Sequence, residues 1–127
     1  MKKILLVLSF VSASAFSHEN PDIKGKCMIV DGVNNVVPCK VSTGGGAGGM
    51  YTAYKIGKKE IVVEESTMCK NGEVTCDTTM GTNPDKLMPA QNYYRDYKTK
   101  KVINKPKEKD WYCTKQIKGK LDACVIY

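Results

Sequence analysis

The segment WYCTKQIKGKLDACVIY, from Trp111 to Tyr127, carries the pattern that decides the fold. Runs of aromatic and β-branched residues lie on both sides of Lys118-Gly119. Such runs around a glycine-containing turn predict a β-hairpin. An even-length loop centred on Lys118-Gly119 places Cys113 opposite Cys124. We therefore predict two antiparallel strands cross-linked by a Cys113–Cys124 disulfide.

A second hairpin of the same kind is predicted nearer the N-terminus. Cys27 and Cys39 lie on either side of the turn-forming stretch Asp31–Asn35. Its Asp-Gly and Asn-Asn pairs tolerate the left-handed backbone that short hairpin loops require. A three-residue loop over 32–34 pairs Asp31 with Asn35 and places Cys27 opposite Cys39. This register predicts a Cys27–Cys39 disulfide.

A third cysteine pair lies in the middle of the chain. A four-residue loop over 71–74 places Cys69 opposite Cys76, which predicts their disulfide. Asn71-Gly72 alone favours a tighter turn, and that turn shifts Cys76 two residues out of register. Local pairing is one of fifteen connectivities for six cysteines. A swapped arrangement remains open, because distant strands can also bring cysteines within bonding distance.

The first residues have the three regions of a secretory signal peptide. Lys2 and Lys3 precede a short apolar run at 4–11, and small residues follow. We expect residues 1–17 to be removed, with cleavage after Ala15 or after Ser17. Residues 18–127 are then expected to form one domain, located in the periplasm or secreted. An even number of cysteines after such a signal favours disulfides over a metal site.

The predicted fold is mainly β. Strands are expected at 51–56 and 60–64, joined through 57–59, since both are rich in β-branched and aromatic residues. Asn83-Pro84 resembles a helix start, but Pro89 limits any helix to about one turn. We expect a small single domain of antiparallel hairpins stapled by disulfides, resembling a small barrel or sandwich, with no transmembrane segment in the mature chain.

Catalytic and cofactor chemistry finds little support in the sequence. The glycine run at 44–49 lacks the Gly-Lys-Ser/Thr ending of a phosphate-binding loop, and we interpret it as a flexible or close-packed loop. His18 is the only histidine, so Ser-His and Cys-His catalysis is not expected. Glu64 and Glu65 point to opposite faces of a strand, and with Asp77 they are interpreted as solvated. We predict no enzyme activity, no cofactor and no metal site.

The positive charge of the chain is concentrated in one stretch. Without Lys2 and Lys3, 18 basic and 13 acidic residues leave a net charge of +5. The stretch Lys98–Lys109 alone holds six lysines and one glutamate, also a net +5. Aromatic residues precede it. The residues predicted to contact a partner are Tyr93, Tyr94, Arg95, Tyr97, Lys98, Lys100, Lys101 and Lys105.

Two functions fit this combination of residues. Tyrosine, tryptophan and arginine concentrate binding energy at protein interfaces. The leading hypothesis is therefore an exported, non-enzymatic protein-binding module, of the inhibitor or immunity type. The alternative is a protein that binds an envelope polyanion, such as lipopolysaccharide or a phosphorylated glycan, through its lysines. Nucleic acid is not an expected partner. A third interpretation is that the tyrosines pack in the core and the lysines form a solvated loop.

Overall fold

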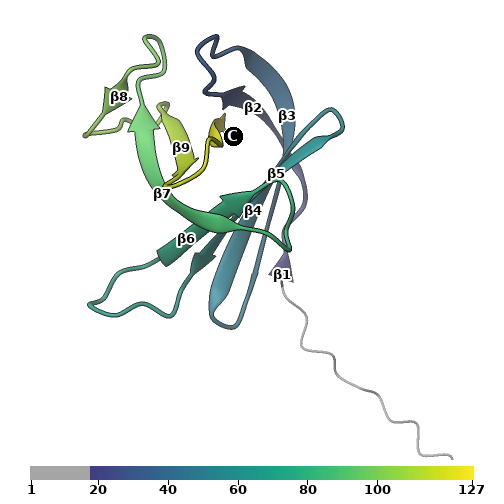
Figure 1. The fold of residues 1–127 in the computed structure, drawn as a ribbon, viewed down its shortest axis with the longest axis vertical. Helices are drawn as coiled ribbons and strands as arrows, with labels where there is room; N and C mark the ends of the chain where they lie inside the picture. The colour runs from purple at the N-terminus through teal and green to yellow at the C-terminus, as the bar shows by residue number, and fades with distance from the viewer. Residues whose placement is uncertain (1–17) are drawn as a thin grey trace, which may run out of the picture.

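The computed structural model describes residues 18–127, so the predicted signal peptide, 1–17, lies outside the described residues. Figure 1 shows their fold, which consists of strands joined by turns and loops. The strands are β1 (His18–Glu19), β2 (Ile23–Ile29), β3 (Val36–Gly46), β4 (Gly49–Ile56), β5 (Lys59–Ser66), β6 (Cys76–Gly81), β7 (Met88–Arg95), β8 (Val102–Ile103), β9 (Trp111–Gln116) and β10 (Asp122–Ile126). The prediction of a mainly β fold is confirmed.

Strand β3 closes the sheet into a barrel. Its first half, 36–41, pairs with β2, and its second half, 40–46, pairs with β4 on the opposite edge. The antiparallel order β3-β2-β10-β9-β7-β6-β5-β4 thus returns to β3, which makes an eight-stranded closed barrel. Strand β1 continues the line of β2 along β3, and β8 pairs with the end of β7. A closed barrel leaves few unpaired edges.

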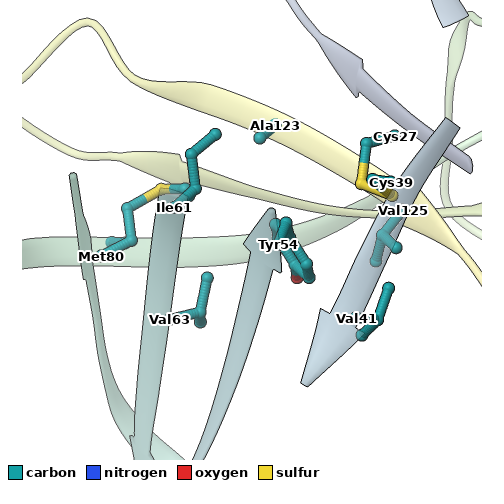
Figure 2. Close-up of a cluster of buried hydrophobic side chains, with 10 residues drawn as sticks. Cys27, Cys39, Val41, Tyr54, Ile61, Val63, Met80, Ala123 and Val125 are labelled. Carbon is teal, nitrogen blue, oxygen red and sulfur yellow. A yellow bond between two sulfur atoms is a disulfide. The ribbon is translucent and has the colours of Figure 1, made fainter. Parts of the chain in front are cut away.

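The interior of the barrel contains the main apolar core. Because side chains alternate between the two faces of a strand, every second residue of the barrel strands points inward. Figure 2 shows these side chains directed toward one another. The buried members of this cluster are Cys27, Cys39, Val41, Tyr54, Ile61, Val63, Met80, Ala90, Ala123 and Val125. These side chains fill the barrel from strands on all sides, so the barrel encloses a packed core.

All three predicted disulfides are present, but two of the three predicted registers are wrong. Cys113 lies directly opposite Cys124, as predicted. In the first hairpin Cys27 pairs instead with Val37, and Cys39 pairs with Gly25. A shift of two residues keeps each side chain on its original face. Both sulfurs therefore still face the interior and bond, with 5.8 Å between their Cα atoms.

The turn of the first hairpin explains this shift. The Oδ1 atom of Asp31 accepts hydrogen bonds from the amides of Val33 and Asn34. The amide of Val30 donates to the carbonyl of Asp122, so it belongs to the ladder with β10. Pairing of β2 with β3 stops at Met28 and Val36, which leaves a longer loop than predicted.

The Cys69–Cys76 disulfide closes a loop between β5 and β6. Cys76 pairs with Ser66, whereas Cys69 lies in the loop. The predicted four-residue loop with Cys69 opposite Cys76 is therefore wrong. Asn71 and Gly72 both have positive φ, 64° and 70°, as the two central residues of a type I′ turn do. The tighter turn at Asn71-Gly72 is the one that forms.

The glycine run at 44–49 is part of the sheet, so its interpretation as a loop is wrong. It ends β3 and begins β4, and only Ala47 and Gly48 form the turn. Gly48 has φ of 93°, which a side chain would strain. A Cβ on Gly44 would lie 2.6 Å from the ring of Tyr51, so glycine is needed where this ring covers the strand.

The remaining sequence predictions concern turns. The 51–56 and 60–64 strands pair as predicted, but Ile56 pairs with Lys59, which leaves a two-residue turn. At 82–87 the side chain of Asn83 accepts a hydrogen bond from the amide of Asp85. This is a capped turn rather than a helix. Within residues 18–127 no helix has the length and hydropathy needed to span a bilayer.

Candidate functional site

The connection from β7 to β9, residues 96–110, leaves the barrel as a long excursion that we call the basic segment. It contains all six lysines of the stretch 98–109. Figure 1 shows it beside β7, with β8 lying against the end of that strand. Val102 and Ile103 of β8 pair with Arg95 and Tyr94 of β7. The segment is therefore joined to the barrel by sheet hydrogen bonds.

Two aspartates at its ends hold the backbone of the basic segment. Asp96 Oδ2 accepts hydrogen bonds from the amides of Lys98 and Thr99, at 3.0 and 2.7 Å. Asp110 accepts from the amides of Tyr97 and Lys107, at 3.0 and 2.7 Å. The amide of Thr99 is the main cause that holds the pKa of Asp96 below its ordinary value. Both carboxylates therefore fix the loop conformation by capping backbone donors.

The indole of Trp111 anchors the segment to the outside of the barrel. Its side chain is 1% exposed and belongs to a second cluster with Met28, Cys113 and Cys124. These residues alternate with the inward-facing ones, so the cluster lies on the outer face of β2, β9 and β10. The indole nitrogen donates a 3.3 Å hydrogen bond to the carbonyl of Tyr97. A partly polar, mostly apolar contact of this kind suits tryptophan.

A tyrosine–arginine pair connects β7 with the basic segment. The hydroxyl of Tyr93 donates to Asp122 Oδ1 at 2.5 Å. The guanidinium of Arg95 donates to Tyr93 Oη at 3.0 Å and to the carbonyl of Lys100 at 2.8 Å. It also lies 5.2 Å from the centroid of the Tyr93 ring, within cation–π range. Burial, and next the bond to Asp122, raise the pKa of Tyr93 to about 12.

The structure brings most of the predicted contact residues together, with one exception. Tyr93 and Arg95 are half-buried on the outer side of β7, where Arg95 contacts the backbone of Lys100, and Tyr97 is exposed next to Lys98. Tyr94 points into the barrel, where its ring meets that of Tyr112 edge-on at 5.5 Å between centroids. Adjacent strand residues must alternate, and this separates Tyr94 from Tyr93.

The lysines of the segment differ in exposure. Lys98, Lys101 and Lys105 are exposed, and Tyr97 beside them is 43% exposed. Lys100 is half-buried, and its ammonium donates a 3.1 Å hydrogen bond to the carbonyl of Asn34 in the β2–β3 turn. Within residues 18–127, Lys100 therefore has a side-chain hydrogen bond that Lys98, Lys101 and Lys105 lack.

The sequence prediction missed a polar network inside the barrel. Glu65 Oε1 accepts hydrogen bonds from Asn92 Nδ2 at 2.8 Å and from Tyr112 Oη at 3.2 Å. The hydroxyl of Thr114 donates to Asn92 Oδ1 at 2.8 Å. Burial, and then the nearby Glu65 charge, raise the pKa of Tyr112. The sequence did contain a sign of this network. Ile61, Val63 and Glu65 are every second residue of one strand, so the apolar first two predict that Glu65 also points inward.

The outer groove beside the glycine-rich turn offers a further surface. A hollow of about 490 Å³ lies between this turn and β6, lined by Tyr51, Glu64 and Asp77 among others. Glu65 also lines this hollow, close to the shift in register between Glu64 and Ser66. It therefore borders the outer groove as well as joining the network inside the barrel. Among residues 18–127, no group of three or more metal-binding side chains is gathered to hold an ion.

No known family model, curated protein or solved structure matches this chain. Two features of the structure can carry a function: the ordered basic segment outside the barrel and the polar network within it.

Proposed function

We propose that this protein is an exported, non-enzymatic module that binds another protein, as an inhibitor or immunity-type protein that caps an active site. The observation that carries the proposal is the order of the basic segment. Asp96, Asp110 and Trp111 hold its backbone, while Tyr97 and most of its lysines stay exposed.

Preorganisation supports tight binding to a protein surface. A loop whose conformation is already fixed loses little entropy on association. Tyrosine and arginine supply large contact area and directional hydrogen bonds at interfaces. The exposed lysines favour a partner whose binding surface is acidic, because complementary charge accelerates encounter and selects the partner. The contact surface we propose consists of Tyr97 and the exposed lysines, with Tyr93 and Arg95 supporting it from β7.

An exported location is part of this proposal. The three disulfides indicate an oxidising environment. The predicted signal peptide is consistent with the periplasm or secretion. Three cross-links on an eight-stranded barrel also give a scaffold that stays folded outside the cell.

Affinity capture with charge-reversal variants tests the proposal. The wild-type protein should recover one stoichiometric protein from envelope or secreted extract. The double variant Lys98→Glu/Lys101→Glu should lose it. The matched control is Lys58→Glu/Lys59→Glu, which reverses two exposed lysines at the β4–β5 turn and should retain it. Equal loss in both variants, or no partner at all, would contradict a specific interface on the basic segment.

The second candidate is binding of an envelope polyanion, favoured by the exposure of Lys101, Lys105, Lys107 and Lys109. Phosphate contacts through lysine weaken steeply as salt rises. An interface centred on aromatic residues should keep most of its affinity. Binding measured across a salt series, with lipopolysaccharide and with any captured protein, separates the two functions.

A further inference from the structure

A hollow opens into the barrel at the end where β4 begins and β5 finishes. Its volume is about 270 Å³, just below the roughly 300–1,000 Å³ of sites for drug-sized ligands. The lining residues are Met50, Thr52, Val63, Glu65, Tyr112 and Tyr127. Eight-stranded barrels can hold one small ligand in this position. The size favours a compact ligand.

Glu65 is the one acidic side chain in that lining. Both of its described hydrogen bonds use Oε1, and both donors, Asn92 and Tyr112, are neutral. The carboxylate is half-buried, and a charge removed from water is costly unless it is paired. These contacts fix the orientation of the carboxylate without neutralising it. A cation is the ligand that would complete the site.

Aromatic residues line the hollow together with this carboxylate. Tyr112 and Tyr127 line the hollow, and the ring of Tyr94 meets Tyr112 edge-on. Burial, and next the charges of Tyr127 and Glu65, raise the pKa of the neighbouring buried Tyr54. Aromatic faces with a carboxylate are the combination that recognises organic ammonium groups.

We propose that this hollow binds an alkylammonium group, supplied either by a small free amine or by a lysine side chain of a partner protein. Glu65 pairs with the ammonium, Tyr112 and Tyr127 cover its alkyl stem, and Met50 and Val63 complete the apolar wall. Asn92 is a positioning residue that holds Glu65. The site is separate from the basic segment and goes beyond the proposed function.

Titration of the folded protein with n-butylammonium tests the site. Binding should shift the NMR signals of the Tyr112 and Tyr127 rings, and n-butanol, its uncharged analogue, should bind at least about tenfold more weakly, since a charge-assisted contact is absent. Butanol binding as tightly as butylammonium would overturn the proposal. So would the absence of any shift at these rings.

Two neighbouring carboxylates provide a matched pair of variants. Glu65→Gln removes the charge but keeps an acceptor for Asn92 and Tyr112, and should weaken butylammonium binding about tenfold or more. Glu64→Gln makes the same change on the outer face and should leave binding unchanged. Equal losses in both variants would contradict the site. If Glu65→Gln fails to fold, Tyr127→Ala, at a side chain 61% exposed, should weaken binding instead, and unchanged affinity there would contradict it.

Two further titrations separate the source of the ammonium and the two proposals. A blocked Ala-Lys-Ala peptide that binds with the same dependence on Glu65 identifies a partner lysine. Binding of butylammonium without the peptide identifies a free amine. The variant Lys98→Glu/Lys101→Glu should keep full butylammonium affinity, so loss of partner capture and loss of this site are observed independently.

Discussion

The two longest connections of the barrel, 67–75 and 96–110, are held in place by different means. The first is closed by the Cys69–Cys76 disulfide. The second, the basic segment, has no cross-link and depends on Asp96, Asp110 and the indole of Trp111. A covalent bond constrains the unfolded chain, whereas caps and burial act only in the folded state. The basic segment should therefore be the more sensitive of the two to substitution and pH.

The largest loss of folding stability is expected for Trp111→Ala. Truncating a fully buried tryptophan costs about 3–5 kcal/mol, and the carbonyl of Tyr97 loses its donor. Urea unfolding should show this loss, and hydrogen exchange should accelerate through the basic segment. Trp111→Phe, which keeps part of the packing, should lose less. Unchanged exchange at 96–110 in the alanine variant would show that the indole does not anchor it.

The double variant Cys69→Ser/Cys76→Ser should have the next largest effect. A loop of this size contributes about 2–3 kcal/mol in the chain-entropy description. Chemical denaturation should reveal that decrease, and the amides of the 67–75 loop should exchange faster. The basic segment should keep its protection. Faster exchange there as well would mean that the two connections are coupled.

A smaller loss is expected for Asp110→Ala. The amides of Tyr97 and Lys107 lose their acceptor, at a cost of about 1–2 kcal/mol. Exchange at those two amides measures the local effect. The control is Asp85→Ala, which removes an exposed carboxylate that makes none of the described hydrogen bonds. It should change neither the free energy of unfolding nor the exchange of these two amides. A similar loss in the control would point to net charge rather than capping.

The smallest change in stability is expected when the Asp96 cap is protonated at acid pH. The amide of Thr99 is the main cause that lowers the pKa of Asp96 below 3.8, its ordinary value. A lowered folded-state pKa means that the cap stabilises the fold above this ordinary value, and that its contribution disappears as pH falls through the lower folded pKa. The amide signals of Lys98 and Thr99 should shift with a midpoint below 3.8.

The variant Asp96→Asn should lack this transition. The Cys69–Cys76 disulfide should remain intact over the whole pH range of the titration. A midpoint at or above the ordinary value would show that Asp96 does not cap the segment in solution. Such a result would also remove one of the contacts on which the preorganisation of the basic segment depends.

Much of the hairpin structure followed from local sequence. Cys113 and Cys124 were predicted opposite each other, because the even loop around Lys118-Gly119 is a property of nearby residues. The register at Cys27 was predicted wrongly because Val30 bonds to Asp122 of β10, which is distant in the chain. Local turn preference could not include that competing partner.

The sequence by itself determined the β character and the concentration of lysines after β7, and it favoured the three local disulfide pairs without excluding a swapped arrangement. Only the tertiary structure decided that β3 pairs along both edges and closes the barrel. Closure placed Tyr94 inside and brought Asn92, Tyr112 and Glu65 together. The physical reason is the range of the interactions: turn and alternation preferences act between near neighbours, whereas contacts across a barrel join strands whose pairing depends on every other strand.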